Sequence, residues 1–349
     1  MLFLFVLAFI ICVVRVQYVN QGFNAEYLSR ESTNAIKGIF IILVFIQHII
    51  PYILDSGYVV GEGFSAELFY FIKGHINQWI VAMFLFYSGY GVMESIRCKG
   101  EVYVKQMPKK RILKVFVDFA VAVSIYIVLA LLLNQHLSVA KCLLAFTGWE
   151  SVGNSNWYIF VIIILYLITY CCAVSLKCPQ LIYFILFVTL IVAGVLCCFK
   201  PTYWSNTILC YVAGLFYSHY RSLLEPLFKS KYYIILILLV LSMSCLDRMP
   251  FVMHSVLYNV FAVLFCFMVL LATMKLRIKN EFLIWLGKNL FPIYIYQRIP
   301  MIILSSIYDG YFAASRPICY TLTCFIITLL IACIYKQLEI NFKRLLAWC

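Results

Sequence analysis

The sequence predicts an all-α polytopic membrane protein. The chain is 65% hydrophobic and only 12% of its residues are charged, so it has more apolar surface than one soluble core can bury. Apolar runs long enough to cross a bilayer recur from one end of the chain to the other. Only a helix satisfies its own backbone hydrogen bonds in lipid, so each of these runs is predicted to be a helix.

About eleven transmembrane helices are predicted, near residues 1–19, 35–54, 77–94, 111–133, 156–176, 180–199, 204–220, 231–246, 251–274, 282–307 and 317–336. The first apolar run has no basic segment before it and no clear cleavage site after it, so we expect a retained helix. Two regions follow. Residues 1–34 are an N-terminal transmembrane helix with a cytoplasmic connection, and residues 35–349 are a membrane domain with a cytoplasmic C-terminal tail.

The basic residues predict the orientation of the chain. Most of the 27 lysines and arginines fall in one set of alternate loops. The other side holds only Lys73, Lys141, Lys200, Arg248, Arg298 and Arg316. Basic loops remain in the cytoplasm, so we expect a multi-pass protein of the cell membrane with its N-terminus outside and its C-terminus in the cytoplasm. The net charge of +13 then points to membrane lipids and an anionic cofactor as partners, not to nucleic acid.

His48 is the first candidate for chemistry. At about 1.5 Å per residue, a helix that enters near Ala35 carries it roughly 20 Å into the membrane, past the midplane of a hydrocarbon core of about 30 Å. Ionisable groups are costly there and are therefore functional candidates, and an imidazole accepts and returns protons near neutral pH. The alternative is a packing histidine bonded to a neighbouring helix.

A basic segment opens the predicted span 111–133 on the cytoplasmic side. Lys110 and Arg111 at a helix start can hold phosphates beside free backbone N–H groups, although basic residues are also usual at cytoplasmic helix ends. Asp118 follows Lys114 by one helical turn. It forms either a local ion pair or a support for a basic site residue.

Two further groups lie toward the outside. Asn156 and Trp157 end a loop rich in Gly, Ser, Asn and Trp, and amides beside an indole suit a sugar, although an interfacial aromatic belt has the same composition. Gln297 and Arg298 come late in an outward-running span. They either extend to the outer interface or face an acceptor that enters from outside.

Five segments together carry a family resemblance. In chain order they are Ile36-Lys37-Gly38-Ile39 through His48, Phe84-Leu85-Phe86-Tyr87-Ser88-Gly89-Tyr90, Lys110-Arg111-Ile112-Leu113-Lys114, Asn156-Trp157-Tyr158-Ile159, and Leu286-Gly287-Lys288-Asn289 through Tyr294-Ile295-Tyr296. In this order and spacing, approximately residues 33–336 resemble the acyltransferase 3 family of integral membrane O-acyltransferases. Family members often have Arg in place of Lys37 and His in place of Gln297. The family core has ten helices, so the helix at 1–19 is an addition.

The resemblance implies transfer of an acyl group, expected to be acetyl, from cytoplasmic acyl-coenzyme A to a hydroxyl of a cell-envelope or exported polysaccharide. His48 is then the catalytic base or briefly carries the acyl group. Lys37, Lys110 and Arg111 are the expected cofactor-binding residues. The expected contacts to the glycan acceptor come from Asn156, Trp157, Gln297 and Arg298.

Two other functions fit the same composition. A glycan transporter or flippase also needs polar groups at depth, but transporters often show internal repeats and none is visible here. A non-catalytic assembly subunit would leave His48 replaceable. No metal site is expected, and the oligomeric state is not specified by the sequence.

Overall fold

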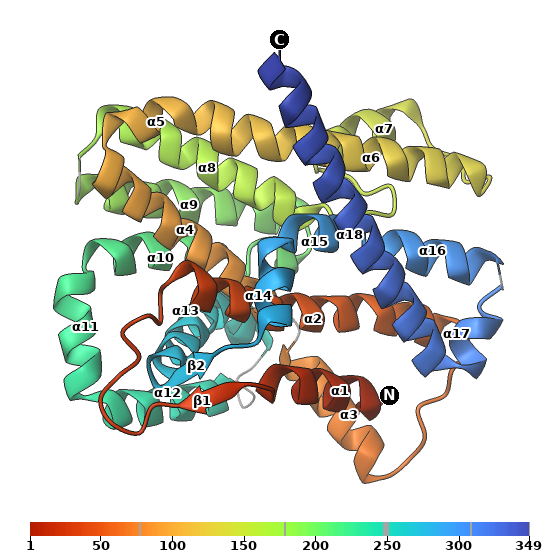
Figure 1. The fold of residues 1–349 in the computed structure, drawn as a ribbon, viewed down its shortest axis with the longest axis horizontal. Helices are drawn as coiled ribbons and strands as arrows, with labels where there is room; N and C mark the ends of the chain where they lie inside the picture. Colours follow the sequence, from red (N-terminus) through yellow and green to blue (C-terminus); the bar gives the residue numbers. More distant parts are fainter. Residues whose placement is uncertain (77, 178, 247–250, 308, 349) are drawn as a thin grey trace.

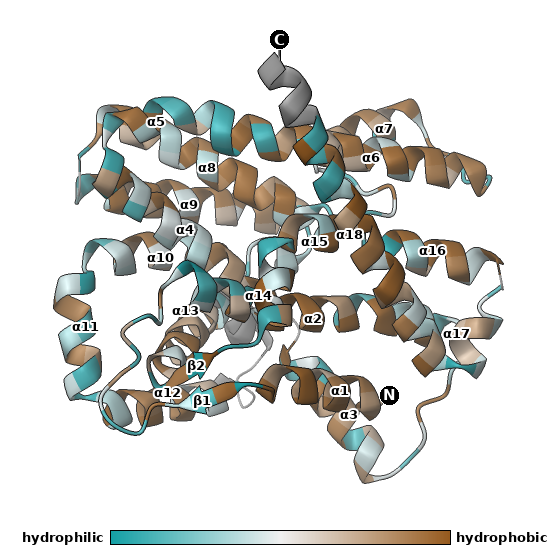
Figure 2. Cartoon of the chain, in the orientation of Figure 1, coloured by the Kyte–Doolittle hydropathy of each residue, from teal (hydrophilic) through white to brown (hydrophobic). Residues whose placement is uncertain are grey.

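The computed structural model describes residues 1–76, 78–177, 179–246, 251–307 and 309–348. The described chain is an array of helices with one short two-stranded ribbon (Figure 1). Figure 2 shows apolar residues along most of the long helices and polar residues concentrated at their ends and connections. The predicted all-α membrane fold is confirmed.

The helices are, in chain order, α1 (Leu2–Val13), α2 (Arg30–Asp55), α3 (Phe64–Ile76), α4 (Trp79–Lys99), α5 (Glu101–Met107), the π-helical turn η1 (Pro108–Leu113), α6 (Lys114–Leu132), α7 (Val139–Phe146), α8 (Trp157–Ser175), α9 (Gln180–Phe199), the 3-10 turn η2 (Thr202–Trp204), α10 (Leu209–His219), α11 (Arg221–Ser230), α12 (Tyr232–Leu246), α13 (Phe251–Lys275), α14 (Glu281–Lys288), α15 (Leu290–Tyr296), α16 (Arg298–Ile307), α17 (Tyr311–Ser315) and α18 (Pro317–Trp348). The strands are β1 (Val16–Tyr18) and β2 (Leu276–Ile278).

Within the described residues, eight helical stretches are long and apolar enough to cross a membrane. The number is nine if α11 and α12, which bend by 93° at their junction, form one span. Each of the eleven predicted spans overlaps a helix, but the predicted count is higher than these eight or nine. The difference arises mainly at α1 and α10, which are too short to cross a bilayer alone. At about 1.5 Å per residue, α1 reaches roughly 18 Å, against a hydrocarbon core of about 30 Å.

The first helix ends earlier than predicted because the chain after it forms a strand. Residues 16–18 pair antiparallel with residues 276–278, and Gln17 lies opposite Arg277. Asn280 strengthens this junction: its Oδ1 accepts from the Leu283 N–H and caps α14, and its Nδ2 donates to the Ile11 carbonyl at 3.0 Å. The N-terminal segment is therefore attached to the connection between α13 and α14. Residues 55–76, which lie between the predicted spans 35–54 and 77–94, are also not wholly a loop, since they contain α3.

Two helix pairs approach so closely that only glycine fits between their backbones. A Cβ at Gly38 of α2 or at Gly287 of α14 would collide with a backbone carbonyl of the other helix of the pair. The same relation joins Gly89 of α4 and Gly214 of α10. Small residues permit this close packing of membrane helices. The first of these contacts fixes α2, which carries His48, relative to α14.

Candidate functional site

His48 lines a cavity of about 330 Å³. This cavity lies between α2, α4, the connection from α7 to α8, and the junction of α15 and α16. The polar side chains that line this cavity, here named the histidine cavity, include Gln47, Gln78, Ser155, Asn156, Trp157 and Arg298. Pro51 follows His48 in α2, and a proline leaves the carbonyl one turn earlier without its helical partner. Gln47 ties this turn to α3, since its Nε2 donates to the Lys73 carbonyl at 3.0 Å.

Several buried polar atoms around His48 lack a formed hydrogen bond within the described residues. They include His48 Nδ1, Gln78 Oε1, Tyr294 Oη, Gln297 Oε1 and Arg298 Nε. Gln297 lies close enough to His48, and Ser155 to Tyr294, for a small adjustment to form a hydrogen bond, and Arg298 lies near enough for its charge to act on His48. A buried polar atom without a partner costs about 1–3 kcal/mol, and native proteins contain few such atoms. Their concentration around one cavity indicates a place for a polar ligand.

A second, basic cavity of about 460 Å³ lies on the predicted cytoplasmic side. Its lining includes Lys37 from α2 and Arg111 from η1. The Lys37 ammonium lies 5.9 Å from the centre of the Tyr87 ring, and Arg111 Nε donates to Tyr103 Oη at 3.1 Å. In the part of the chain that the structure describes, neither cation forms an ion pair with a carboxylate. Two facing cations without counterions favour an anionic ligand.

The π-helical turn η1 aims Arg111 at this cavity. Residues 101–132 form one continuous helical stretch in which η1 interrupts the α-helix. The prediction of a helix start with free N–H groups at Lys110 and Arg111 is therefore wrong, because α5 precedes them. Lys110 is exposed and lines none of the described cavities. A π-turn widens the helix by one residue and is frequent at functional sites, and here only Arg111 of the pair points inward.

A row of aromatic rings separates the two cavities. Tyr158 lines the basic cavity and Tyr294 lines the histidine cavity. Their ring centres are 5.4 Å apart in an edge-to-face contact. Tyr158 also lies edge-to-face against Phe84 at 6.2 Å, and Tyr294 lies 6.2 Å from the imidazole of His48. These contacts place the two tyrosine rings between the lining of the basic cavity and His48.

A family model described as an acyltransferase domain matches residues 30–336. The chain belongs to the acyltransferase 3 family. Searches of curated proteins and of solved structures gave no match. Family membership supports membrane acyltransferase activity and favours it over the transporter and assembly functions.

The acyltransferase fold divides the predicted site residues between the two cavities. His48, Asn156, Trp157 and Arg298 line the histidine cavity, and buried Gln297 lies behind them. Lys37 and Arg111 line the basic cavity, and Lys110 lies outside it. The side-chain amide of Asn156 also donates to the Gly148 carbonyl at 2.8 Å, so part of its hydrogen-bonding capacity shapes the outer loop.

Asp118 resolves one alternative left open by the sequence. Lys114 Nζ lies 3.3 Å from its carboxylate and 2.7 Å from that of Glu339 on α18. Asp118 therefore belongs to a local ion pair that joins α6 to the C-terminal helix. It does not reach the basic residues of either cavity.

Two features of the candidate site have no clear signal in the sequence. Tyr158 is adjacent to Trp157, but only the cavities on its two sides reveal its separating role. In the sequence, Lys200 is only one of the few basic residues on the predicted outer side. Its Nζ donates to the Trp149 carbonyl at 2.7 Å and pairs with Glu150 at 3.1 Å, so it holds the connection that leads to Ser155. A lysine on the side with few basic residues was the available signal.

Proposed function

We propose that this acyltransferase moves an acyl group, acetyl in the simplest case, from cytoplasmic acyl-coenzyme A to a hydroxyl of a cell-envelope or exported polysaccharide. The observation that carries the proposal is the pair of cavities on the two sides of Tyr158 and Tyr294. One cavity offers unpaired cations, and the other offers a histidine among unpaired polar groups. A charged donor and a polyhydroxyl acceptor need two such different environments.

The basic cavity suits the phosphate groups of the donor. Lys37 and Arg111 supply positive charge from two different elements, and Arg in particular can bind a phosphate through two parallel hydrogen bonds. The uncharged pantetheine arm would then extend toward Tyr158. Displacement of the Tyr158 ring would bring the thioester to His48.

The chemistry at His48 is acyl transfer from sulfur to oxygen. His48 takes the proton of an acceptor hydroxyl, and the oxygen attacks the thioester carbonyl carbon. A carbon–oxygen bond forms, the carbon–sulfur bond breaks, and the proton passes from the imidazole to the departing thiolate. If the acyl group first resides on His48, the hydroxyl attacks the acyl-imidazole in a second step.

The test is a comparison of envelope and exported glycans from cells with and without the gene. Mass spectrometry should show an acyl increment that disappears on deletion and returns with the wild-type gene. A glycan profile that is unchanged by deletion, in cells that express the protein, would contradict the proposed function. Increased free coenzyme A from purified protein given acyl-coenzyme A and that glycan supplies the donor half of the test.

A further inference from the structure

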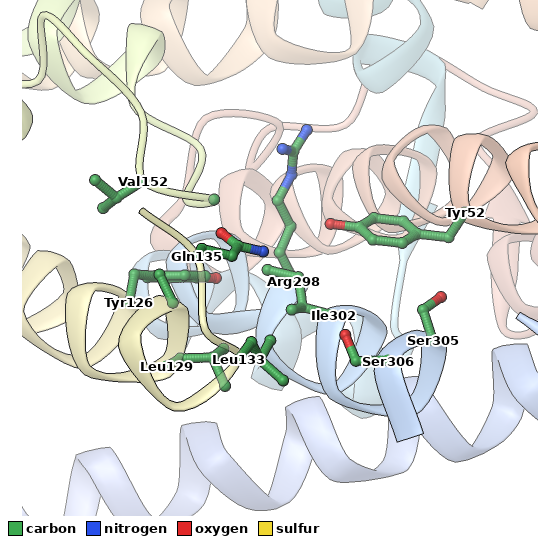
Figure 3. Close-up of a pocket in the computed structure, with 12 residues that line it drawn as sticks. Tyr52, Tyr126, Leu129, Leu133, Gln135, Val152, Arg298, Ile302, Ser305 and Ser306 are labelled. Carbon is green, nitrogen blue, oxygen red and sulfur yellow. The ribbon is translucent and has the colours of Figure 1, made fainter. Parts of the chain in front are cut away.

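A third cavity of about 320 Å³ lies beside the histidine cavity, and Arg298 lines both (Figure 3). Its polar lining includes Tyr52, Gln135, Arg298, Ser305 and Ser306. Figure 3 shows the Tyr52 hydroxyl and the Gln135 amide on opposite sides of the Arg298 side chain, whose guanidinium extends beyond them. This space is here named the outer cavity.

Within the described residues, Arg298 has no anionic partner. Its Nε is buried without a hydrogen bond, and no carboxylate of the described residues lies within 4.0 Å of it. A partly buried guanidinium without a counterion is costly, whereas its planar fork matches a carboxylate or a phosphate. A cation kept in this state between two cavities indicates an anionic ligand.

The rest of the outer cavity suits a sugar. Leu129, Leu133 and Ile302 form an apolar wall, against which the C–H face of a sugar ring packs. Gln135 and Ser306 supply hydrogen-bonding groups for its hydroxyls. Ligand sites commonly combine an apolar lining with a few placed polar groups, and their volumes begin at about 300 Å³. Both the histidine cavity and the outer cavity reach that size.

We propose that the acceptor is an acidic glycan of at least two sugar units, with its anionic group held by Arg298. One unit presents its hydroxyl to His48 in the histidine cavity, and its neighbour occupies the outer cavity. The anion is either the carboxylate of a uronic acid or a phosphate in the glycan chain. This inference rests on the proposed function and names its substrate class.

The decisive experiment locates the acyl group on the glycan that loses it when the gene is deleted. Tandem mass spectrometry and NMR should place it on an acidic unit or on the unit next to one, and they distinguish a carboxylate from a phosphate. An acyl group within a wholly neutral stretch would overturn the inference but leave the proposed function intact. No change on deletion would instead refute the proposed function.

Variants test the two parts of the subsite separately. Arg298→Gln should lower acceptor kcat/KM by roughly ten- to a hundredfold, as for loss of a hydrogen bond to a charged group, and leave the KM for acyl-coenzyme A unchanged. Arg298→Lys should retain part of the activity because it keeps the charge but loses the fork. Equal activity of Arg298→Gln and wild type on the native glycan would exclude the anionic contact.

Ser306→Trp fills the outer cavity without altering His48 or Arg298. It should reduce glycan acylation several-fold at normal membrane abundance. The matched control is Ser315→Trp, an exposed position on α17 that does not line this cavity, and it should behave as wild type. Full acylation by Ser306→Trp would show that the acceptor does not enter the outer cavity.

Discussion

At the scale of single residues, His48 carries the strongest expectation. His48→Ala removes the proton acceptor and should lower the acylation rate by roughly 10²–10⁴-fold, or more if an acyl-enzyme forms. His48→Gln keeps hydrogen bonding but not basicity, so it should fail nearly as severely. Folding should persist, because an alanine leaves no buried charge behind. Glycan acylation and membrane abundance are measured together for both variants.

His136→Gln is the matched control for these variants, since it makes the same substitution at an exposed position in the connection from α6 to α7. It should acylate at the wild-type level. Near-normal acylation by an abundant His48→Ala protein would contradict the catalytic role and favour a transporter or assembly function.

Neighbouring basic residues in η1 should differ in their effects. Arg111→Ala should raise the KM for acyl-coenzyme A by about ten- to a hundredfold, because one charged contact to a phosphate contributes roughly 1.5–3 kcal/mol. Lys110→Ala should change it little, because this side chain is exposed outside the basic cavity. Initial rates at varied donor concentration decide the matter. A larger effect at Lys110 than at Arg111 would remove the basic cavity from donor binding.

Tyr158 should control the passage between the cavities. Tyr158→Ala opens the aromatic row, so water gains access to the thioester beside His48. Release of free coenzyme A without acceptor should rise several-fold while glycan acylation falls. Tyr158→Phe keeps the ring and should preserve transfer. If Tyr158→Ala leaves acceptor-independent release at the wild-type rate, the ring does not form the barrier.

At the scale of elements, the sequence predicts where helices form more reliably than it predicts which other segments of the chain they pair with or pack against. The depth of His48 follows from counting residues in one apolar run, so its place in α2 could be predicted. The end of α1 could not, because Val16–Tyr18 lies directly after the apolar run and Arg15 and becomes a strand only through pairing with residues 276–278. Arg111 presents the same difficulty. Its inward direction depends on η1, and a π-turn inside a continuous helix has no simple sequence signal.

The close contact of α2 and α14 gives a prediction about stability. Gly38→Ala places a methyl group against the Leu283 carbonyl, and the helices have to separate to accept it. Overpacking of this kind costs about 1–3 kcal/mol, so the detergent-solubilised protein should unfold at a lower temperature. Gly194→Ala in α9 meets no atom within 4 Å and should be neutral or slightly stabilising. Equal melting temperatures for the two variants would contradict the tight packing.

At the scale of the whole molecule, the proposed function requires a particular orientation of the chain in the membrane, because the basic cavity and the histidine cavity serve different substrates. Under the proposed function, the basic cavity should face the cytoplasm, where acyl-coenzyme A would be supplied, and the histidine and outer cavities should face the glycan. The charge distribution predicts the same arrangement independently. The two arguments meet at opposite ends of α2, where Lys37 lines one cavity and His48 lines the other.

Cysteine labelling with a membrane-impermeant reagent tests this orientation. In a background without accessible native thiols, Gly61→Cys, in the exposed connection before α3, should be labelled in intact cells. Lys105→Cys, exposed on α5, should be labelled only after the cells are opened, and Lys229→Cys on α11 serves as a second cytoplasmic position. Labelling at position 105 but not at position 61 in intact cells would show that the chain has the opposite orientation in the membrane. The cations of the basic cavity would then face away from cytoplasmic acyl-coenzyme A. That result would contradict the proposed donor as well as the predicted topology.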